Sequence, residues 1–405
     1  MRIAFVLDEA AQVGGGFQQS LSTILSLRSL QGHELVIFTN SAENLAILRS
    51  EDVQCHLHGF NRYRRLFARM LLSTPTMRRV FRHLPRPLQN LLEPFEALLD
   101  HHRIDAVICF FLSWAPHHIY RHPFIATVYD LCHRDRPEFP EVAERYEFES
   151  RETSLRESLP RALAVLVSST SLGEKITRYY GVDKARIIVL PFIPAPHARQ
   201  PADEMELRRV RQRYSLPPDY IFYPAQFWPH KNHVYLLHGL QILQRDTGIR
   251  LHAVFCGTDF GSETHVRKTA ELLGLTDNVH FLGFVDSADI CGLYSGARAL
   301  VMPTYFGPTN IPPLEAMATQ CPVIYSDLPE FREELGDAAL YCDLRDPGSL
   351  TEQLNVILTR PEIVGALRKA GQAKLASTRP DTYSKRLQIL FDELAYTRQR
   401  LPPPT

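Results

Sequence analysis

The chain has 405 residues, enough for two or three domains that each bury a hydrophobic core. Hydrophobic residues make up 45% and charged residues 22%, and the equal totals of 45 basic and 45 acidic residues argue against nucleic acid as a partner. The seven cysteines show no CxxC spacing, which favours reduced core residues over metal ligands or disulfides and fits a cytoplasmic protein. The N-terminus lacks a signal-peptide pattern, and no apolar run approaches the roughly 18 residues that span a bilayer.

The first half of the chain alternates short apolar runs with helical patterns. Residues 2–7 predict a strand, the glycine-rich turn that includes Gly15 and Gly16 leads into a helix, and ELVIFT predicts the next strand. The glycines would let the backbone approach a ligand, although a flexible loop explains them equally well. Two buried strands at IDAVICFF and PFIATVYDL, a charged helix near 142–159 and a helix ending at Gly181 follow. This order predicts a parallel-sheet domain over residues 1–191.

Residues 53–92 contain no Asp or Glu but several arginines. Arg62, Arg64 and Arg65 alternate with Tyr63 and Leu66, which predicts a basic, amphipathic face. Such a face suits an anionic membrane or a phosphate-bearing acceptor. The alternative is a solvated pair of helices whose arginines pair with acids elsewhere.

The segment YDLCHRDRPEFPE places polar side chains after a buried strand. Tyr129, Asp130, His133 and Arg134 lie where open α/β sheets bind ligands, at the carboxyl end of a strand. A binding or proton-transfer site is one interpretation, and a loop with an ordinary His–Asp pair is the other.

A proline-rich stretch over 192–217 predicts an interdomain linker. Strand–helix alternation then resumes over 218–380, which predicts a second parallel-sheet domain across a cleft from the first. The tail reads as three helices broken at Pro361 and Pro380, and we expect the last, over 381–400, to pack on the N-terminal domain.

Within the second half, the sequence predicts a strand at 299–302, a polar loop at 303–312, a helix at 313–319 and a strand at 322–325. The amides at the mouth of the helix would face an anion, and Glu315 in the first turn would accept hydrogen bonds from hydroxyl groups. These features suit a nucleotide sugar. An ordinary strand–loop–helix crossover is the alternative.

Three segments at these intervals carry a family resemblance: FYPAQFWPHKNH (222–233), FLGFV (281–285) and FGPTNIPPLEAMA (306–318). Together they resemble the retaining glycosyltransferases of family four, and more narrowly the bacterial mannosyltransferases of surface-polysaccharide assembly. The resemblance implies an α/β protein of the GT-B fold, with two Rossmann-like domains facing across a cleft.

The resemblance also implies roles for individual residues. Lys231 would bind the donor diphosphate, Glu315 the ribose, and the 309–311 loop the sugar and β-phosphate. The implied catalytic residues are Lys231, Asp130 and His133, and the implied donor-binding residues are Gln226, Lys231, Phe284, Val285, Thr309, Asn310, Ile311, Glu315, Gly15 and Gly16. The basic residues Arg62, Arg64 and Arg65 would lie on the acceptor or membrane side.

Three positions depart from the family pattern. Gln226 replaces a phosphate-binding Arg, Gly307 replaces the first Glu of a Glu–seven residues–Glu motif, and Tyr129 replaces a His before Asp130. Gln can hydrogen-bond a phosphate but cannot neutralise its charge. These departures keep a catalytically silent donor-binding or scaffold subunit open as an alternative.

The expected function is retaining transfer of a sugar, most simply mannose from GDP-mannose, to a saccharide or polyprenyl-linked saccharide acceptor in bacterial surface-polysaccharide synthesis. The resemblance implies no cofactor and no metal ion, and a cytoplasmic enzyme that contacts the inner face of the membrane peripherally. Another GT-B enzyme that uses a UDP- or dTDP-sugar, as an inverting transferase or an epimerase, remains the competing enzymatic interpretation.

Overall fold

A computed structural model describes residues 1–8, 15–60, 63, 66–67, 70, 74–110, 112–194, 200–307, 311–377 and 380–400. The chain divides into two compact units. Unit 1 comprises Met1–Leu131, Phe148–Pro191 and the C-terminal segment from Pro380, and unit 2 comprises Cys132–Glu147 and Phe192–Arg379.

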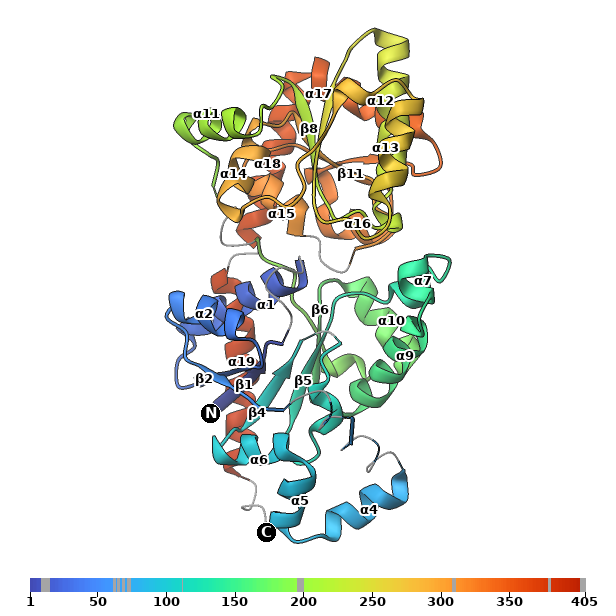
Figure 1. Ribbon diagram of the computed structural model, residues 1–405. Coiled ribbons are helices and arrows are strands. Elements are labelled where there is room, and N and C mark those ends of the chain that lie inside the picture. The colour runs from blue at the N-terminus through green and yellow to red at the C-terminus, as the bar shows by residue number, and fades with distance from the viewer. Residues whose placement is uncertain are drawn as a thin grey trace. The chain divides into compact units, whose positions relative to one another are not determined.

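Unit 1 is built on a parallel sheet with the strand order β3-β2-β1-β4-β5-β6-β7. Its strands are β1 (Arg2–Val6), β2 (Glu34–Thr39), β3 (Cys55–Leu57), β4 (Ala106–Cys109), β5 (Phe124–Val128), β6 (Ala164–Val167) and β7 (Ile187–Val189). Residues such as Phe5, Val107 and Ile125 have no exposed surface, because helices cover both faces of the sheet (Figure 1). Burial on both faces explains the continuous apolar runs of the sequence.

Helices of unit 1 include the predicted first βαβ unit, in which α1 (Gly15–Ser26) joins β1 to β2. The others are α2 (Ala42–Ser50), α4 (Pro75–His83), α5 (Arg86–Leu92), α6 (Pro94–His101), α9 (Glu147–Ser158), α10 (Thr170–Tyr180) and α19 (Pro380–Gln399). Helix α10 ends as predicted, because Gly181 adopts the left-handed conformation with φ of 66°. Helix α19 runs beside the N-terminal elements (Figure 1), where the Gln388 side chain donates to the Gln31 carbonyl at 3.0 Å.

The prediction of a single charged helix near 142–159 is wrong at the start of that helix. The structure instead has the short helix α8 (Pro140–Ala143) and then α9. Arg145 and Tyr146 between them have φ of 55° and 61°, a left-handed conformation that a continuous α-helix excludes.

Unit 2 contains a second parallel sheet, in the order β10-β9-β8-β11-β12-β13. Its strands are β8 (Tyr220–Pro224), β9 (His252–Cys256), β10 (Val279–Phe281), β11 (Ala299–Met302), β12 (Val323–Ser326) and β13 (Leu340–Cys342). The prediction of two parallel-sheet domains is therefore confirmed.

The helices of unit 2 follow the predicted alternation. They are α7 (Cys132–Asp135), α8, α11 (Glu204–Arg213), α12 (His233–Thr247), α13 (Glu263–Leu272), α14 (Ser287–Gly296), α15 (Ile311–Ala318), α16 (Pro329–Leu335), α17 (Pro347–Thr359) and α18 (Pro361–Ser377). The tail breaks at Pro361 and Pro380 as expected. Part of the segment predicted as a linker is helix α11, which Asp203 caps by accepting from the Glu206 amide at 2.8 Å.

The strand–loop–helix prediction at 299–325 is confirmed for β11, but the helix begins earlier than expected. Helix α15 starts at Ile311, so both Pro312 and Pro313 sit in its first turn, where a missing N–H costs nothing. Glu315 is consequently the fifth residue of the helix, and the prediction that it lies in the first turn is wrong.

All seven cysteines are free, and six of them are buried. Within the described part of the chain, no helix combines the length and apolar character needed to cross a membrane.

Candidate functional site

The strand order of unit 2 reverses between β8 and β11. In open parallel sheets, ligands bind outside the carboxyl ends of the strands at such a switch point. The segments that follow these two strands are residues 225–232 and 303–307. The first carries Gln226 and Lys231, and the second precedes helix α15, which carries Ile311 and Glu315.

Lys231 ends a short 3-10 turn, Pro229–Lys231, which leads from β8 into α12. Its carbonyl accepts a hydrogen bond from the buried Tyr223 hydroxyl at 2.8 Å. The preceding carbonyl, of His230, accepts from the Tyr305 amide at 2.9 Å and from the Thr304 hydroxyl at 3.2 Å. These bonds fix the Lys231 turn against the loop after β11, so the two segments flanking the switch point form one assembly.

Glu315 lies on α15, which follows that loop, and a buried neighbour orients its side chain. The residue is 7% exposed, and one carboxylate oxygen accepts a hydrogen bond from the Tyr294 hydroxyl at 2.9 Å. Burial, and then the neighbouring Glu315 charge, raise the pKa of Tyr294 well above its usual value, so this hydroxyl remains a donor. Tyr294 therefore sets the orientation in which the carboxylate can meet a ligand.

His230 is held by Glu141 of helix α8, also in unit 2. The His230 amide donates to a Glu141 carboxylate oxygen at 3.0 Å, and the ring nitrogen Nδ1 contacts the same oxygen. Phe306 stacks on the His230 ring with a centroid distance of 4.1 Å. Burial alone would raise the pKa of Glu141, but hydrogen bonds from the His230 ring and backbone outweigh it, and the pKa is lowered. Glu141 is thus a charged residue that holds the turn carrying Lys231 in place.

His233 begins α12 two residues after Lys231 and is enclosed by aromatic rings. Its ring stacks on Phe227 at 4.5 Å and lies 4.7 Å from the ring of Tyr223. Burial, and then the charges of Lys231 and His230, lower the pKa of His233 to about 3. His233 is therefore neutral near neutral pH.

The turns after β8, β9 and β10 lie against one another at the same sheet edge. Gly257 after β9 has φ of 150°, and a Cβ atom there would lie 2.5 Å from the Ala225 carbonyl oxygen, so only glycine fits. Its amide donates to the Gly283 carbonyl at 2.9 Å. Beyond Gly283, the side chain of Phe284 is 71% exposed whereas Val285 is buried.

Gln226, which stands in place of the family's Arg, is oriented by an aromatic pair. Its side-chain oxygen accepts from the Trp228 indole N–H at 3.1 Å, and the indole stacks on Phe260 at 4.3 Å. With the oxygen engaged, the amide group of Gln226 is the part that can donate to a phosphate.

The structure brings part of the predicted site together. Gln226, Lys231, Phe284, Val285, Ile311 and Glu315 all follow carboxyl ends of strands in unit 2. Asp130 belongs to unit 1, where it lies 3.6 Å from Arg151, while His133 is buried in helix α7 of unit 2. Gly15 and Gly16 open helix α1 in unit 1. Thr309 and Asn310, like Arg62, Arg64 and Arg65, lie outside the described residues.

Sequence reasoning missed Glu141 and Tyr294. Glu141 stands 89 residues before His230, and Tyr294 stands 21 residues before Glu315. No local motif links residues at such separations. The signal available for Tyr294 was its position next to Leu293 in α14, where a buried tyrosine hydroxyl needs a hydrogen-bond partner.

Two family models match the chain. Residues 15–192 match the glycosyl transferase 4-like domain, and residues 206–374 match the glycosyl transferases group 1 family. Together they cover both units apart from short terminal and linking segments.

Curated relatives and a solved structure agree with these models. The chain is 28% identical over 249 residues to O-antigen chain mannosyltransferase B of Escherichia coli, covering 60% of this chain and 62% of that protein. It is 29% identical over 211 residues to O-antigen chain mannosyltransferase RfbU of Salmonella typhimurium, covering 52% and 55%. The crystal structure of Anabaena Alr3699/HepE in complex with UDP and glucose superposes with a TM-score of 0.71 at 16% identity, covering 97% of this chain and 100% of that one.

The chain thus matches somewhat more than half the length of these two relatives. At 16% identity, the likeness to the solved structure shows the fold alone. A glycosyl transferase 4-like domain is followed by a glycosyl transferases group 1 domain, and the chain forms two parallel sheets. The chain therefore belongs to the glycosyltransferases of the GT-B fold.

Proposed function

We propose that this protein is a retaining glycosyltransferase that moves mannose from GDP-mannose to a saccharide or polyprenyl-linked saccharide in bacterial surface-polysaccharide synthesis. The observation that carries the proposal is the pair of hydrogen bonds from Thr304 and Tyr305 to the His230 carbonyl. They join a lysine turn to the loop that leads to Glu315, at the switch point of unit 2. The names of the two O-antigen relatives support mannose as the sugar.

In this proposal Lys231 binds the diphosphate of the donor. The bond between the anomeric carbon and the phosphate oxygen breaks through an oxocarbenium-like transition state, while the acceptor oxygen bonds to the same face of that carbon. The acceptor's hydroxyl proton ends on the departing diphosphate. Negative charge grows on that diphosphate, so a fixed ammonium group stabilises the transition state more than the ground state. The positive end of the α15 dipole stabilises the same charge, although Pro312 and Pro313 in its first turn have no N–H to donate.

Glu315 and Phe284 fit the nucleoside end of the donor. A carboxylate that Tyr294 already orients can accept hydrogen bonds from the two ribose hydroxyls. The exposed ring of Phe284 offers a face on which the base can stack.

Removal of the Lys231 charge tests the mechanism. We expect Lys231→Ala to lower the transfer rate about a hundredfold, the usual effect of losing one donor to developing charge. The measurement is transfer from radiolabelled GDP-mannose to lipid-linked acceptor, with UDP- and dTDP-sugars as competing donors. Lys268→Ala, an exposed lysine on α13, is the matched control and should keep the wild-type rate. Since the proposal includes no metal ion, EDTA should leave the wild-type rate unchanged.

An unchanged rate in folded Lys231→Ala would remove Lys231 from the mechanism. Donor conversion without any acceptor would indicate an epimerase. The replacements at Gln226 and Gly307 favour a second candidate, a silent donor-binding subunit. Binding of GDP-mannose without turnover on any acceptor would support that candidate.

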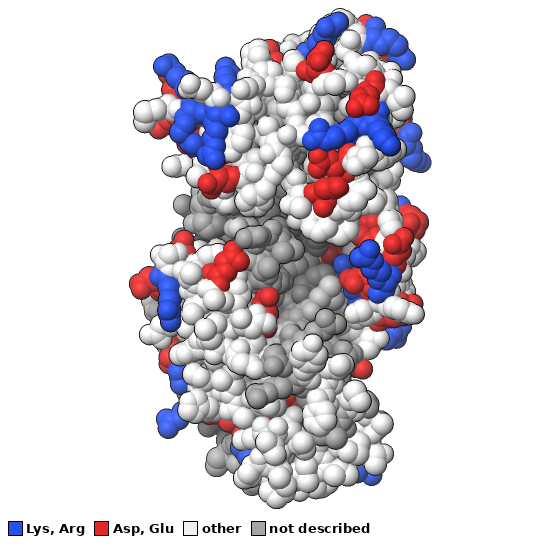
Figure 2. Space-filling view, in the orientation of Figure 1, with Lys and Arg blue, Asp and Glu red and all other residues white. Residues whose placement is uncertain are grey.

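The proposal also includes a peripheral contact of unit 1 with the inner face of the cytoplasmic membrane. Tyr63, Leu66, Phe67, Met70 and Leu91 are each more than half exposed. Among the residues that Figure 2 colours, few charges lie over the end of unit 1 that carries α4 and α5. An apolar surface beside a basic segment is typical of proteins that lie on anionic lipid.

A further inference from the structure

Unit 1 has a switch point of its own, between β1 and β4. Asp8 follows β1, and Trp114 follows β4. The Trp114 indole N–H donates to Asp8 Oδ2 at 2.7 Å, so one hydrogen bond spans the reversal in strand order. This is the place where an open parallel sheet offers a ligand site, and the proposed donor chemistry in unit 2 does not use it.

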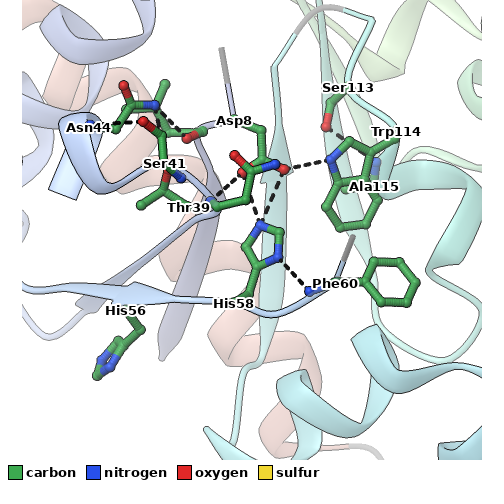
Figure 3. Close-up of polar contacts among 12 residues, drawn as sticks. Asp8, Thr39, Ser41, Asn44, His56, His58, Phe60, Ser113, Trp114 and Ala115 are labelled. Atoms are coloured by element: carbon green, nitrogen blue, oxygen red, sulfur yellow. Dashed lines mark hydrogen bonds and ion pairs between the residues drawn. The ribbon is translucent and has the colours of Figure 1, made fainter. Parts of the chain in front are cut away.

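Two further groups from the same edge of the sheet hold Asp8 (Figure 3). The Asn40 amide, after β2, donates to Oδ1 at 2.9 Å, and His58 Nε2, after β3, lies 2.9 Å from the same oxygen. His58 Nδ1 accepts from the Phe60 amide at 3.3 Å, which places the ring proton on Nε2, facing Asp8. Loops after the neighbouring strands β1, β2, β3 and β4 therefore converge on one carboxylate.

The roles of these residues follow from their hydrogen bonds. His58 uses both ring nitrogens and is 1% exposed in its side chain, so it is a positioning residue and cannot take a proton from a ligand. Asp8 keeps 14% of its side chain exposed, and among the described residues it contacts no Lys or Arg. His58 Nε2 also lies 3.2 Å from Oδ2, so three donors share the two oxygens. A carboxylate has about four acceptor positions, and a hydroxyl group of a ligand is a suitable donor for the one that remains.

The surroundings of Asp8 combine an aromatic surface with a strained backbone. The partly exposed Trp114 ring packs 4.9 Å from Phe95 and 5.2 Å from Phe60, which fixes the plane of the indole. Leu112, two residues earlier and 37% exposed, has φ of 55°, a conformation rarely adopted by leucine. Such strain persists where the surrounding structure requires it, often at ligand sites. A carboxylate next to a fixed aromatic ring suits a sugar, which has both hydroxyls and an apolar C–H face.

We propose that Asp8, oriented by His58, Trp114 and Asn40, binds a hydroxyl group of the saccharide acceptor at the switch point of unit 1. The identification of this saccharide as the acceptor rests on the proposed function, but its binding can be measured without any donor. The competing explanation is that Asp8 only ties the loops after β1, β2, β3 and β4 together.

The test is saturation-transfer NMR of the full chain with millimolar methyl α-mannoside and mannobiose. The wild type should bind, and Asp8→Asn should weaken binding roughly tenfold to a hundredfold, as expected for loss of hydrogen bonds to a charged group. Asp105→Asn is the matched control and should bind like the wild type. Asp105 accepts from the Arg2 amide at 2.8 Å, but it precedes β4 and so lies at the opposite edge of the sheet.

Equal saccharide binding by wild type and Asp8→Asn, or no binding by the wild type, would overturn the inference. If Asp8→Asn does not fold, Trp114→Phe replaces it, because that variant keeps the carboxylate and loses the orienting N–H. It should weaken saccharide binding while the affinity for GDP-mannose, measured by calorimetry, is unchanged. Saccharide binding that depends on Asp8, together with no binding of GDP-mannose, would keep this inference and reject the proposed function.

Discussion

At the scale of single residues, the hydrogen bond from Tyr294 to Glu315 allows the orientation of the Glu315 carboxylate to be tested separately from the stability of the fold. Tyr294→Phe removes only the hydroxyl that orients the carboxylate. We expect it to weaken nucleotide binding about fivefold to tenfold, the value of one hydrogen bond of about 1 kcal/mol. Calorimetric titration with GDP measures the effect.

Tyr220→Phe is the matched control for that experiment. Tyr220 is equally buried in unit 2, and its hydroxyl donates to the Leu293 carbonyl at 2.8 Å, away from Glu315. Its loss should lower the unfolding temperature and leave GDP affinity intact. If both variants bind GDP like the wild type, the Tyr294 hydroxyl has no role in the donor site.

A second prediction at this scale concerns Glu93 in unit 1. The residue has no exposed surface and lies 3.1 Å from His118. Burial, and then the charge of Glu96, raise its pKa from 4.5 to about 8. The folded state thus binds a proton that the unfolded state has lost, so Glu93 makes the free energy of unfolding decrease as pH rises from about 4.5 to about 8.

Glu93→Gln keeps a neutral side chain at every pH and should flatten that decrease. Urea unfolding at several pH values across this window measures it. Glu157→Gln is the control, because Glu157 pairs with His117 at 3.0 Å but keeps 38% of its side chain exposed. A Glu93→Gln profile parallel to that of the wild type would show that Glu93 does not remain protonated in the folded protein.

At the scale of elements, helix α8 contacts the turn at Pro229–Lys231, which carries the proposed donor-binding Lys231. Glu141→Ala removes the group that holds the His230 amide and ring. We expect kcat/KM for the donor to decrease about tenfold, since loss of hydrogen bonds to a charged group costs about 1.5–3 kcal/mol and part of that affects the position of Lys231. Steady-state kinetics measure the change.

Glu144→Ala is the control at the exposed end of the same segment. It should keep the wild-type kinetics. Equal kcat/KM for all three proteins would mean that α8 does not position the turn.

The elements also show what the sequence could predict. Strand β11 was predicted at its observed residues, because four buried apolar residues in succession leave little choice. The start of helix α15 was not predicted correctly, because a pair of prolines can occupy more than one position in the first turn of a helix. The break before α9 depends on left-handed Arg145 and Tyr146, which have no turn-forming sequence signature.

For the proposed site, the motif order predicted roles for Lys231 and Glu315 from local sequence, and both residues follow strands that flank the switch point of unit 2. The partners Tyr294, Glu141, His58 and Trp114 come from distant segments that meet only in the folded chain, and residue spacing carries no information about them.

At the scale of the whole molecule, the exposed apolar side chains of unit 1 predict attachment to anionic lipid. Reversal of charge at Arg62, Arg64 and Arg65 should reduce binding to vesicles that contain phosphatidylglycerol, and added salt should reduce wild-type binding. Sedimentation with vesicles of phosphatidylcholine alone gives the baseline. Charge reversal at Arg208 and Arg211 of α11, in unit 2, is the control. Equal sedimentation of both variants at low salt would favour a solvated face.

The division of the chain into two units also limits where a chimaeric protein can be joined. Residues 132–147, which include Glu141, belong to unit 2 although the rest of that unit begins at Phe192. A chimaera joined to a relative at residue 192 would inherit this insertion from the wrong parent and leave His230 facing a foreign side chain. Under the proposed function, exchange of donor preference between relatives therefore requires transplanting residues 132–147 together with the part of unit 2 that begins at Phe192.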